Sequence, residues 1–480
     1  MQKEQEKEKI DTICALATSH AGIGAVAIIR VSGSKSFAVV EKFARKVDSN
    51  EFLLLKGTHR CKYGIFVNHE NIPLDSVLFV YMHAPNSFTG EDVVEIQCHG
   101  GVIQSKIIIE TLLNEGVRLA RCGEFSQRAF LNQRLSLLQA EAVNNIVSAT
   151  TRKGAKVALA NSLGLTTDFI VKLRNQVKSL MALVEVQIDF PEDTDHLEDN
   201  TVEIVTAVTK VIFELQQYLG SFKRGLILRD GFTLVITGPV NSGKSSLFNA
   251  LLKSDRAIVN CLPGTTRDTV SESILIDGWN FNILDTAGLR ETDCSIELEG
   301  IRRSRIAANN ADIEIRLYDM SVNGKAHSQK IMDENLSKTG ISDGVIDNLQ
   351  TAVLMVGNKY DLLTTKDKKE PSTFLNNRLC ISALTGYGIE ELASALVEKA
   401  NTLTRINDSE GIVMTSLRQR NGTVTAIQFL KQAIYSLNES FLDKAADDLL
   451  NSIHSLESLI GLVSKNEVID EIFANFCLGK

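Results

Sequence analysis

Short apolar runs dominate the chain between residue 11 and about residue 130. Three of these runs predict strands, at 26–31, 77–83 and 93–98. Residues 102–114 instead repeat apolar side chains at the spacing of a helix with one apolar face. This mixture predicts a compact α+β domain at the start of the chain.

The pattern becomes helical after residue 130. Apolar residues recur three and four positions apart over 137–163 and 167–188, and a third helix is expected over 202–219. Residues 403–480 show the same helical character. Two stretches of the chain are therefore predicted to be all-α.

Between residues 230 and 400, short apolar runs alternate with helical segments, which predicts a parallel sheet with helices on both faces. The predicted strands lie at 232–237, 280–284, 313–319 and 352–357. We expect this α/β domain to be inserted into one helical domain, although two separate helical domains fit the pattern as well. The expected boundaries are 1–130 for the α+β domain, 131–228 and 403–480 for the two helical parts, and 229–402 for the insertion.

Composition excludes several classes of protein. The 480 residues suggest about three domains. Because 51 basic residues stand against 59 acidic ones, with a net charge of −8, a wholly basic nucleic-acid coat protein is excluded. Segment 118–156 is locally basic, with seven Arg and Lys against Glu124 and Glu141. Both a solvated face and a nucleic-acid contact fit that segment.

The chain shows no targeting or membrane signal. No window reaches the roughly 18 apolar residues of a membrane-spanning helix, and the first ten residues mix acids with bases. The eight cysteines are scattered without a CxxC pair, which is typical of a protein from a reducing compartment. We expect a cytoplasmic protein without a membrane partner.

A phosphate-binding loop is predicted where one strand gives way to a helix. Residues 238–245 read GPVNSGKS and match the pattern GxxxxGK[ST] after the strand at 232–237. Backbone N–H groups and the helix N-terminus would surround phosphate oxygens. Lys244 would reach the β- and γ-phosphates, and Ser245 would hold Mg²⁺.

Further motifs follow in the order that a GTPase requires. DTAG at 285–288 and NKYD at 358–361 each end a predicted strand, and SAL follows at 382–384. Asp361 would accept hydrogen bonds from guanine N1–H and the 2-amino group, which adenine lacks, so GTP is the expected nucleotide. Thr266 would complete the Mg²⁺ shell as a switch threonine. The nucleotide contacts predicted from these motifs are Asn241, Ser242, Gly243, Lys244, Ser245, Ser246, Asp285, Thr286, Ala287, Gly288, Asn358, Lys359, Tyr360, Asp361, Ser382, Ala383 and Leu384.

Hydrolysis needs a group that positions the attacking water. The residue after DTAG is Leu289, near the position where Ras-type enzymes carry a glutamine. A partner's arginine or a monovalent cation could stabilise the charge that develops between the β- and γ-phosphates. The Asn241 side chain could hold such a cation, or it could only support the loop.

The chain resembles the MnmE family, also called TrmE, over almost all of residues 11–480. The resemblance rests on blocks that go beyond the shared GTPase motifs. These blocks are DTI at 11–13, SFTGED at 87–92, HGG at 99–101, GEF at 123–125, RAFLN at 128–132, QAEA at 139–142, DFP at 189–191, GTTRD at 264–268, DTAGLR at 285–290 and FCLGK at 476–480.

This resemblance implies a fold and a function. The fold would be an α+β tetrahydrofolate-binding and dimerisation domain, and an all-α domain interrupted by a Ras-like α/β P-loop GTPase domain. With the FAD-dependent partner MnmG, in a heterotetramer, the homodimer would install an aminomethyl or carboxymethylaminomethyl group at C5 of the wobble uridine of tRNA. The carbon would come from a 5-formyl- or methylene-tetrahydrofolate, and GTP hydrolysis would drive a conformational cycle. The alternative is a ribosome-assembly or stress-response switch GTPase.

The resemblance also implies roles for individual residues. Potassium would be bound by Asn241, Asn260, Leu262 and Thr265, within a nucleotide-contacting loop of Asn260, Cys261, Leu262, Pro263, Gly264 and Thr265. Glu297 would orient water for hydrolysis, and Cys477 would act near the folate chemistry. The folate contacts implied are Arg30, Glu95, Arg134 and Lys480.

Overall fold

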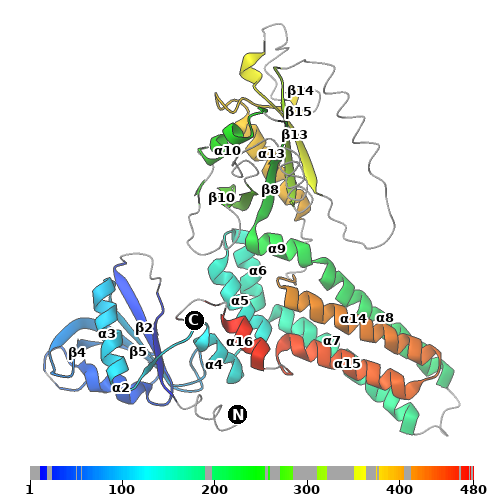
Figure 1. Ribbon diagram of the computed structural model, residues 1–480. Helices are drawn as coiled ribbons and strands as arrows, with labels where there is room; N and C mark the ends of the chain where they lie inside the picture. The colour runs from blue at the N-terminus through cyan, green and yellow to red at the C-terminus, as the bar shows by residue number, and fades with distance from the viewer. Residues whose placement is uncertain are drawn as a thin grey trace, which may run out of the picture. The chain divides into compact units, whose positions relative to one another are not determined.

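A computed structural model divides the chain into two compact units (Figure 1). The first comprises residues 1–147, 158–219 and 417–480, and the second comprises 148–157 and 220–416. The described residues are 11–18, 24–49, 51–55, 57–189, 197–239, 241–253, 258–259, 271–284, 311–321, 351–363, 374–375, 378–404, 412–463, 466–474, 476 and 479. The domain boundaries predicted from sequence remain predictions.

The N-terminal part of the first unit is a seven-stranded sheet in the order β3-β4-β5-β6-β2-β1-β7. Neighbouring strands are antiparallel, except that β1 and β7 are parallel. The strands are β1 (Ile13–Leu16), β2 (Val26–Ser32), β3 (Ala44–Arg45), β4 (Arg60–Val67), β5 (Pro73–Met82), β6 (Val93–His99) and β7 (Arg118–Leu119). The predicted α+β domain is confirmed, although β5 begins four residues before the predicted strand and β1, β3, β4 and β7 were not predicted.

One face of this sheet forms a hydrophobic core, and the other face is partly exposed. Ile29, Phe79 and Ile96 are buried in a cluster with residues of helices α2 (Ser36–Phe43) and α3 (Val102–Asn114). On the opposite face, Tyr63 and Leu78 pair in register and are 58% and 38% exposed. The period-two alternation of strand side chains separates the two faces. The predicted helix at 102–114 is confirmed residue for residue.

Helices make up the rest of the first unit, and α15 packs against both α14 and α7. The helices are α4 (Glu124–Leu131), α5 (Leu137–Ser148), α6 (Arg152–Ser162), α7 (Leu165–Asp189), α8 (Leu197–Gly220), α14 (Leu417–Asn438), α15 (Leu442–Ile460) and α16 (Asn466–Ala474). Residues 148–157, which include the first half of α6, belong to the second unit. Helix α7 precedes the insertion and α15 follows it, and the two pack together. The alternative of two separate helical domains is therefore wrong. No described helix is long and apolar enough to span a membrane.

The single helix predicted over 137–163 is wrong, because α5 and α6 are separate helices. The Thr151 hydroxyl accepts a hydrogen bond from the Gly154 N–H at 2.9 Å, which caps the start of α6. A Cβ on Gly154 would overlap the Leu228 carbonyl of α9 (Phe222–Asp230). The break therefore allows α6 and α9 to approach closely, which periodicity alone does not reveal.

The second unit contains an eight-stranded sheet in the order β14-β15-β13-β12-β8-β11-β10-β9. The four strands predicted here, β8, β11, β12 and β13, are parallel, which confirms the expected parallel sheet. Strands β9, β10 and β14, which were not predicted, add antiparallel pairs to it. The strands are β8 (Phe232–Thr237), β9 (Ile258–Val259), β10 (Ser271–Ile276), β11 (Trp279–Leu284), β12 (Ile313–Asp319), β13 (Ala352–Asn358), β14 (Phe374–Leu375) and β15 (Arg378–Cys380). Helices α10 (Lys244–Leu252) and α13 (Ile389–Leu403) pack on its apolar core.

The chain enters and leaves this α/β domain through adjacent segments. Ser221 Oγ accepts a hydrogen bond from the Met414 N–H at 2.9 Å, and an Arg229 guanidinium N–H donates to the Thr415 carbonyl at 2.7 Å. A Cβ on Gly225 would overlap the Met414 carbonyl. Adjacent entry and exit segments are what an inserted domain requires.

Candidate functional site

The loop between β8 and α10 has the strand–loop–helix geometry of a phosphate-binding loop. Gly238 and Gly243 have φ of 147° and 94°, values that side chains rarely adopt. A Cβ on Gly238 would overlap the Leu317 carbonyl, and one on Gly243 would overlap the Asn358 amide. Asn241 lies between them in the left-handed region, with φ of 64°. The backbone path explains why glycines stand at both ends of the loop.

The polar side chains of this loop gather where α10 begins. Lys244 Nζ donates to the carbonyl oxygens of Gly238 and Pro239 at 3.0 and 2.8 Å, and partial burial lowers the lysine's pKa. Ser242 is buried, and its hydroxyl has no hydrogen-bond partner in the part of the chain that is described. Ser245 and Ser246 are exposed in the first helical turn. A cation and three hydroxyl groups thus lie in the loop and the first turn of α10, where phosphates are expected.

Asn358 joins three motifs that are far apart in the sequence. Its Nδ2 donates to the Ser242 carbonyl at 2.9 Å, and its Oδ1 accepts from the Ala383 N–H at 3.0 Å. Asp361 Oδ1 accepts a hydrogen bond from the Ser382 hydroxyl at 2.5 Å. The predicted phosphate loop, the NKYD motif and the SAL motif therefore form one continuous site.

Sequence reasoning missed Asp319 and Tyr387, which contact the predicted site residues Lys359 and Tyr360. Lys359, with φ of 66°, pairs its Nζ with Asp319 Oδ2 at 2.5 Å. Tyr360 stacks on Tyr387, with ring centroids 4.8 Å apart. Asp319 is the last residue of a predicted strand, and that position at the carboxyl edge of the sheet was the available signal. Leu384 is largely exposed.

Several predicted site residues lie outside the described residues. For the nucleotide and its metals they are Asn260, Cys261, Leu262, Pro263, Gly264, Thr265, Thr266, Asp285, Thr286, Ala287, Gly288 and Glu297, and in the tail they are Cys477 and Lys480. Their predicted roles remain predictions.

A second polar centre lies on the partly exposed face of the N-terminal sheet. Arg30 and Glu95 pair in register between β2 and β6, with Nε donating to Oε1 at 2.9 Å. Both side chains are a little under one-fifth exposed. The guanidinium carbon lies 5.3 and 5.6 Å from the ring centroids of Phe88 and Phe125. The structure thus brings together two of the four residues predicted to bind folate and places aromatic rings beside them.

Arg134 and Gly479, the residue before Lys480, lie near the same strands. Gly90 follows Phe88 in the loop before β6, and a Cβ there would lie 3.1 Å from Arg134 Cγ. Gly479, the residue before Lys480, packs against Leu16 at the end of β1. Since β1 pairs with β2, the tail reaches the strand next to Arg30. Arg134 itself is exposed.

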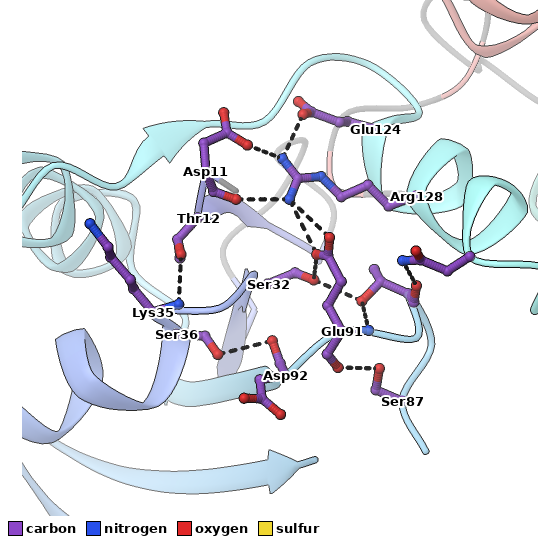
Figure 2. A network of polar contacts seen from close by, with 12 residues as sticks. Asp11, Thr12, Ser32, Lys35, Ser36, Ser87, Glu91, Asp92, Glu124 and Arg128 are labelled. Carbon is purple, nitrogen blue, oxygen red and sulfur yellow. Dashed lines mark hydrogen bonds and ion pairs between the residues drawn. The ribbon is translucent and has the colours of Figure 1, made fainter. Parts of the chain in front are cut away.

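The family-specific blocks of sequence meet in a charged network (Figure 2). The buried Arg128 guanidinium pairs with Asp11 at 2.5 Å, Glu124 at 3.0 Å and Glu91 at 3.2 Å. Burial alone would raise the pKa of Glu124, but hydrogen bonds from Arg118, the Arg121 N–H and Arg128 lower it to about 2. Sequence reasoning did not predict this network, although it quoted the blocks that contribute these residues.

The same network changes the interpretation of the basic segment 118–156. Arg118, Arg121 and Arg128 all pair with Glu124. Arg118 also pairs with Asp11, and Arg128 pairs with Glu91; both acids lie outside the segment. These three arginines stabilise the fold of the N-terminal domain, which favours the structural interpretation of the segment over a nucleic-acid contact.

Two family models match the chain. The model described as the MnmE helical domain matches residues 137–477, and the model of the GTP-binding protein TrmE N-terminus matches residues 12–134. The chain belongs to the MnmE family. The resemblance noted from the sequence is thereby confirmed, together with the multidomain fold class and the enzyme class of the family, a GTP hydrolase.

Curated relatives in this family are similar over nearly their whole length. The tRNA modification GTPase MnmE of Acetivibrio thermocellus is 38% identical, over 98% of this chain and 100% of the relative. The proteins of the same name from Fervidobacterium nodosum and Clostridioides difficile are each 37% identical, over 98% of this chain and 98% and 99% of the relatives. A solved G domain of the T. maritima FeoB iron transporter is 26% identical over 35% of this chain and 98% of that chain, with a TM-score of 0.23.

Proposed function

We propose that the chain is a GTPase of tRNA modification and that the site joined by Asn358 binds its GTP. The observation that carries this proposal is that the Asn358 amide donates to the Ser242 carbonyl in the phosphate loop and accepts from the Ala383 N–H beside the base motif. Those bonds fix the distance between the phosphate and base ends of a nucleotide. Asp361, positioned by Ser382, would then accept from the guanine edge.

We propose that Mg²⁺ binds at the start of α10 and that K⁺ binds beside the phosphate loop. Ser245 is exposed there beside Lys244, and a hydroxyl oxygen suits Mg²⁺. Ser245 and Thr266 would hold Mg²⁺, while Asn241, Asn260, Leu262 and Thr265 would hold K⁺. The cations would neutralise phosphate charge. The chain's own Lys244 would bind the β- and γ-phosphates, and Glu297 would orient water.

The potassium part of the proposal is tested by the salt dependence of hydrolysis. GTP turnover should be faster in KCl than in NaCl at equal ionic strength, because Na⁺ is too small for the same oxygen cage. Asn241→Ala should remove most of this difference, whereas Asn249→Ala, on the outer side of α10, should keep it. Equal rates of the parent protein in the two salts would contradict the potassium site but not the GTPase.

We infer that the Arg30–Glu95 centre binds a 5-formyl- or methylene-tetrahydrofolate. The carboxylate of Glu95 suits the donor edge of a pterin, and Arg30, Arg134 and Lys480 suit the carboxylates of the glutamate tail. The rings of Phe88 and Phe125 add aromatic surface beside the pair. Cys477 would act near this chemistry.

Calorimetry with 5-formyl-tetrahydrofolate tests this second site. Arg30→Met should weaken binding by more than about tenfold, because it removes a charge-assisted hydrogen bond worth about 1.5–3 kcal/mol. Arg60→Met is the matched control, since Arg60 is exposed on β4. Equal affinities of the two variants would contradict the assignment.

We further propose that two copies of the chain pair through the N-terminal domains and assemble with MnmG as a heterotetramer. The partly exposed sheet face, with Tyr63 and Leu78 beside the Arg30–Glu95 pair, supports pairing because it is apolar around a charged centre. The complete enzyme would install the aminomethyl or carboxymethylaminomethyl group at C5 of the wobble uridine. A ribosome-assembly or stress-response switch would need no folate, so folate binding discriminates between these functions.

A further inference from the structure

A groove of about 310 Å³ lies along the hairpin of α14 and α15, which run side by side in Figure 1. Four of its lining residues come from α14, namely Lys431, Gln432, Tyr435 and Ser436, and Lys444 comes from α15. We call this the α14–α15 groove. The lining contains two cations and no acid.

The ammonium groups of the two lysines in the groove are available to bind an anion. Lys431 and Lys444 are exposed, and neither forms an ion pair within the part of the chain that the structure describes. The buried Asp448 accepts a hydrogen bond from the Ser436 hydroxyl at 3.2 Å and does not pair with a lysine. An anion in the groove would therefore meet ammonium groups that are not engaged by a described carboxylate.

Tyr435 adds an exposed aromatic ring to the groove. It stands one helical turn after Lys431, and its side chain is 61% exposed. An exposed aromatic ring between cations is a platform on which a nucleobase can stack while the phosphates contact the lysines. A free phosphate or an acidic peptide would use the lysines but not the ring.

We propose that the α14–α15 groove contacts an RNA strand, with Lys431 and Lys444 on phosphates and Tyr435 beneath an unstacked base. The inference rests on the proposed function in tRNA modification, because that function supplies the RNA. The α14–α15 groove is a better candidate for an RNA contact than the basic segment 118–156, because Arg118, Arg121 and Arg128 are already paired with acids.

The test measures the affinity of the full-length protein for fluorescein-labelled tRNA. Fluorescence anisotropy reports binding at each of a series of KCl concentrations. The double variant Lys431→Ala/Lys444→Ala should reduce the slope of log K against log [KCl] by about 1.4–1.8, as expected for two lost phosphate contacts. Tyr435→Ala should raise the Kd at least about fivefold with an unchanged slope, and Tyr435→Phe should bind normally. All variants should unfold at the temperature of the parent protein.

The matched control is Lys106→Ala/Lys172→Ala, which removes the same charge from exposed positions on α3 and α7. It should leave the slope unchanged. Equal slopes for the two double variants, or no tRNA binding by the parent protein, would overturn the inference. Displacement of tRNA by inorganic phosphate beyond the effect of chloride would assign the groove to a free anion instead. If folate and GTP binding persist in those cases, the proposed function stands and only the groove is wrong.

Discussion

The nucleotide site and the N-terminal polar centre are built in different ways. At the nucleotide site, each functional group belongs to a short motif at a strand end, and Asn358 joins the motifs with two hydrogen bonds. In the N-terminal domain, the buried Arg128 gathers Asp11, Glu91 and Glu124 from three separate segments. One site depends on local backbone geometry, and the other depends on long-range ion pairs.

This difference predicts which kinds of substitution each region should tolerate. Glycines fix the path of the phosphate loop, so the loop is sensitive to side-chain bulk but contains little buried charge. The N-terminal network holds charges that neutralise one another, and Arg128 contacts all three acids, so its removal leaves buried negative charge less well compensated. Substitutions in the two regions should therefore separate effects on catalysis from effects on stability.

The largest effect on stability is expected from Arg128→Met. It leaves Glu91 without an ion-pair partner among the described residues and leaves Glu124 only the more exposed Arg118 and Arg121, so it should destabilise the N-terminal domain by about 3–5 kcal/mol. Hydrogen exchange of the β1 and β2 amides in the full-length protein measures this loss. Arg121→Met is the control, because Arg121 is 55% exposed and should cost less than about 1 kcal/mol. Similar losses in the two variants would contradict the difference between buried and exposed pairs.

Lys244→Ala should have the largest effect on catalysis. It removes the cation at the phosphate loop, and kcat/KM for GTP should fall by about 10²–10³-fold, as for other lost charge-stabilising donors. Protection of the N-terminal amides should not change. Lys253→Ala, just beyond the end of α10, should retain activity. A variant lacking Lys244 with near-normal turnover would show that the loop does not bind the reacting phosphates.

Asp361→Asn should change base selectivity with a smaller effect. The amide cannot accept both guanine hydrogen bonds, so the affinity for GTP should fall by about 10–100-fold, equivalent to about 1.5–3 kcal/mol. XTP, which has a carbonyl in place of the 2-amino group, should bind better than it does to the parent protein. Ser382→Ala removes only the hydroxyl that positions Asp361 and should weaken GTP binding less. Unchanged selectivity in both variants would refute the base site.

The smallest effect is expected from Glu124→Gln and depends on pH. The pKa of Glu124 is lowered to about 2, below its unfolded value near 4.3, so ionised Glu124 stabilises the fold above about pH 4. This stabilisation should be lost as the pH falls toward 2. The variant should be less stable at pH 7 by about 1–3 kcal/mol and should show a flatter profile between pH 5 and 2. Glu110→Gln, at an exposed position, should follow the parent profile.

Sequence alone predicted the nucleotide half well because its signals are local. The strands at 232–237 and 313–319 have the predicted bounds. The N-terminal network could not be predicted, since periodicity does not show that Asp11 meets Arg128 across 117 positions. For the same reason, Arg30 and Glu95 were identified only by resemblance, whereas the structure shows that they are neighbours in register.

The break between α5 and α6 shows another limit of pattern reading. Apolar spacing continues through 137–163, but the Thr151 cap and the close approach of Gly154 to Leu228 require two helices. The antiparallel strands β9, β10 and β14, at the two ends of the sheet order, were missed because the direction in which a strand pairs does not follow from its apolar content.

Mass spectrometry of tRNA nucleosides tests most directly whether both sites serve one modification reaction. Cells without this chain should lose the C5-aminomethyl-type wobble uridines. The intact gene should restore them, while Lys244→Ala and Arg30→Met should each fail, and Lys253→Ala and Arg60→Met should succeed. An unchanged nucleoside profile in cells without the chain would contradict the account and leave a GTPase that acts as a switch.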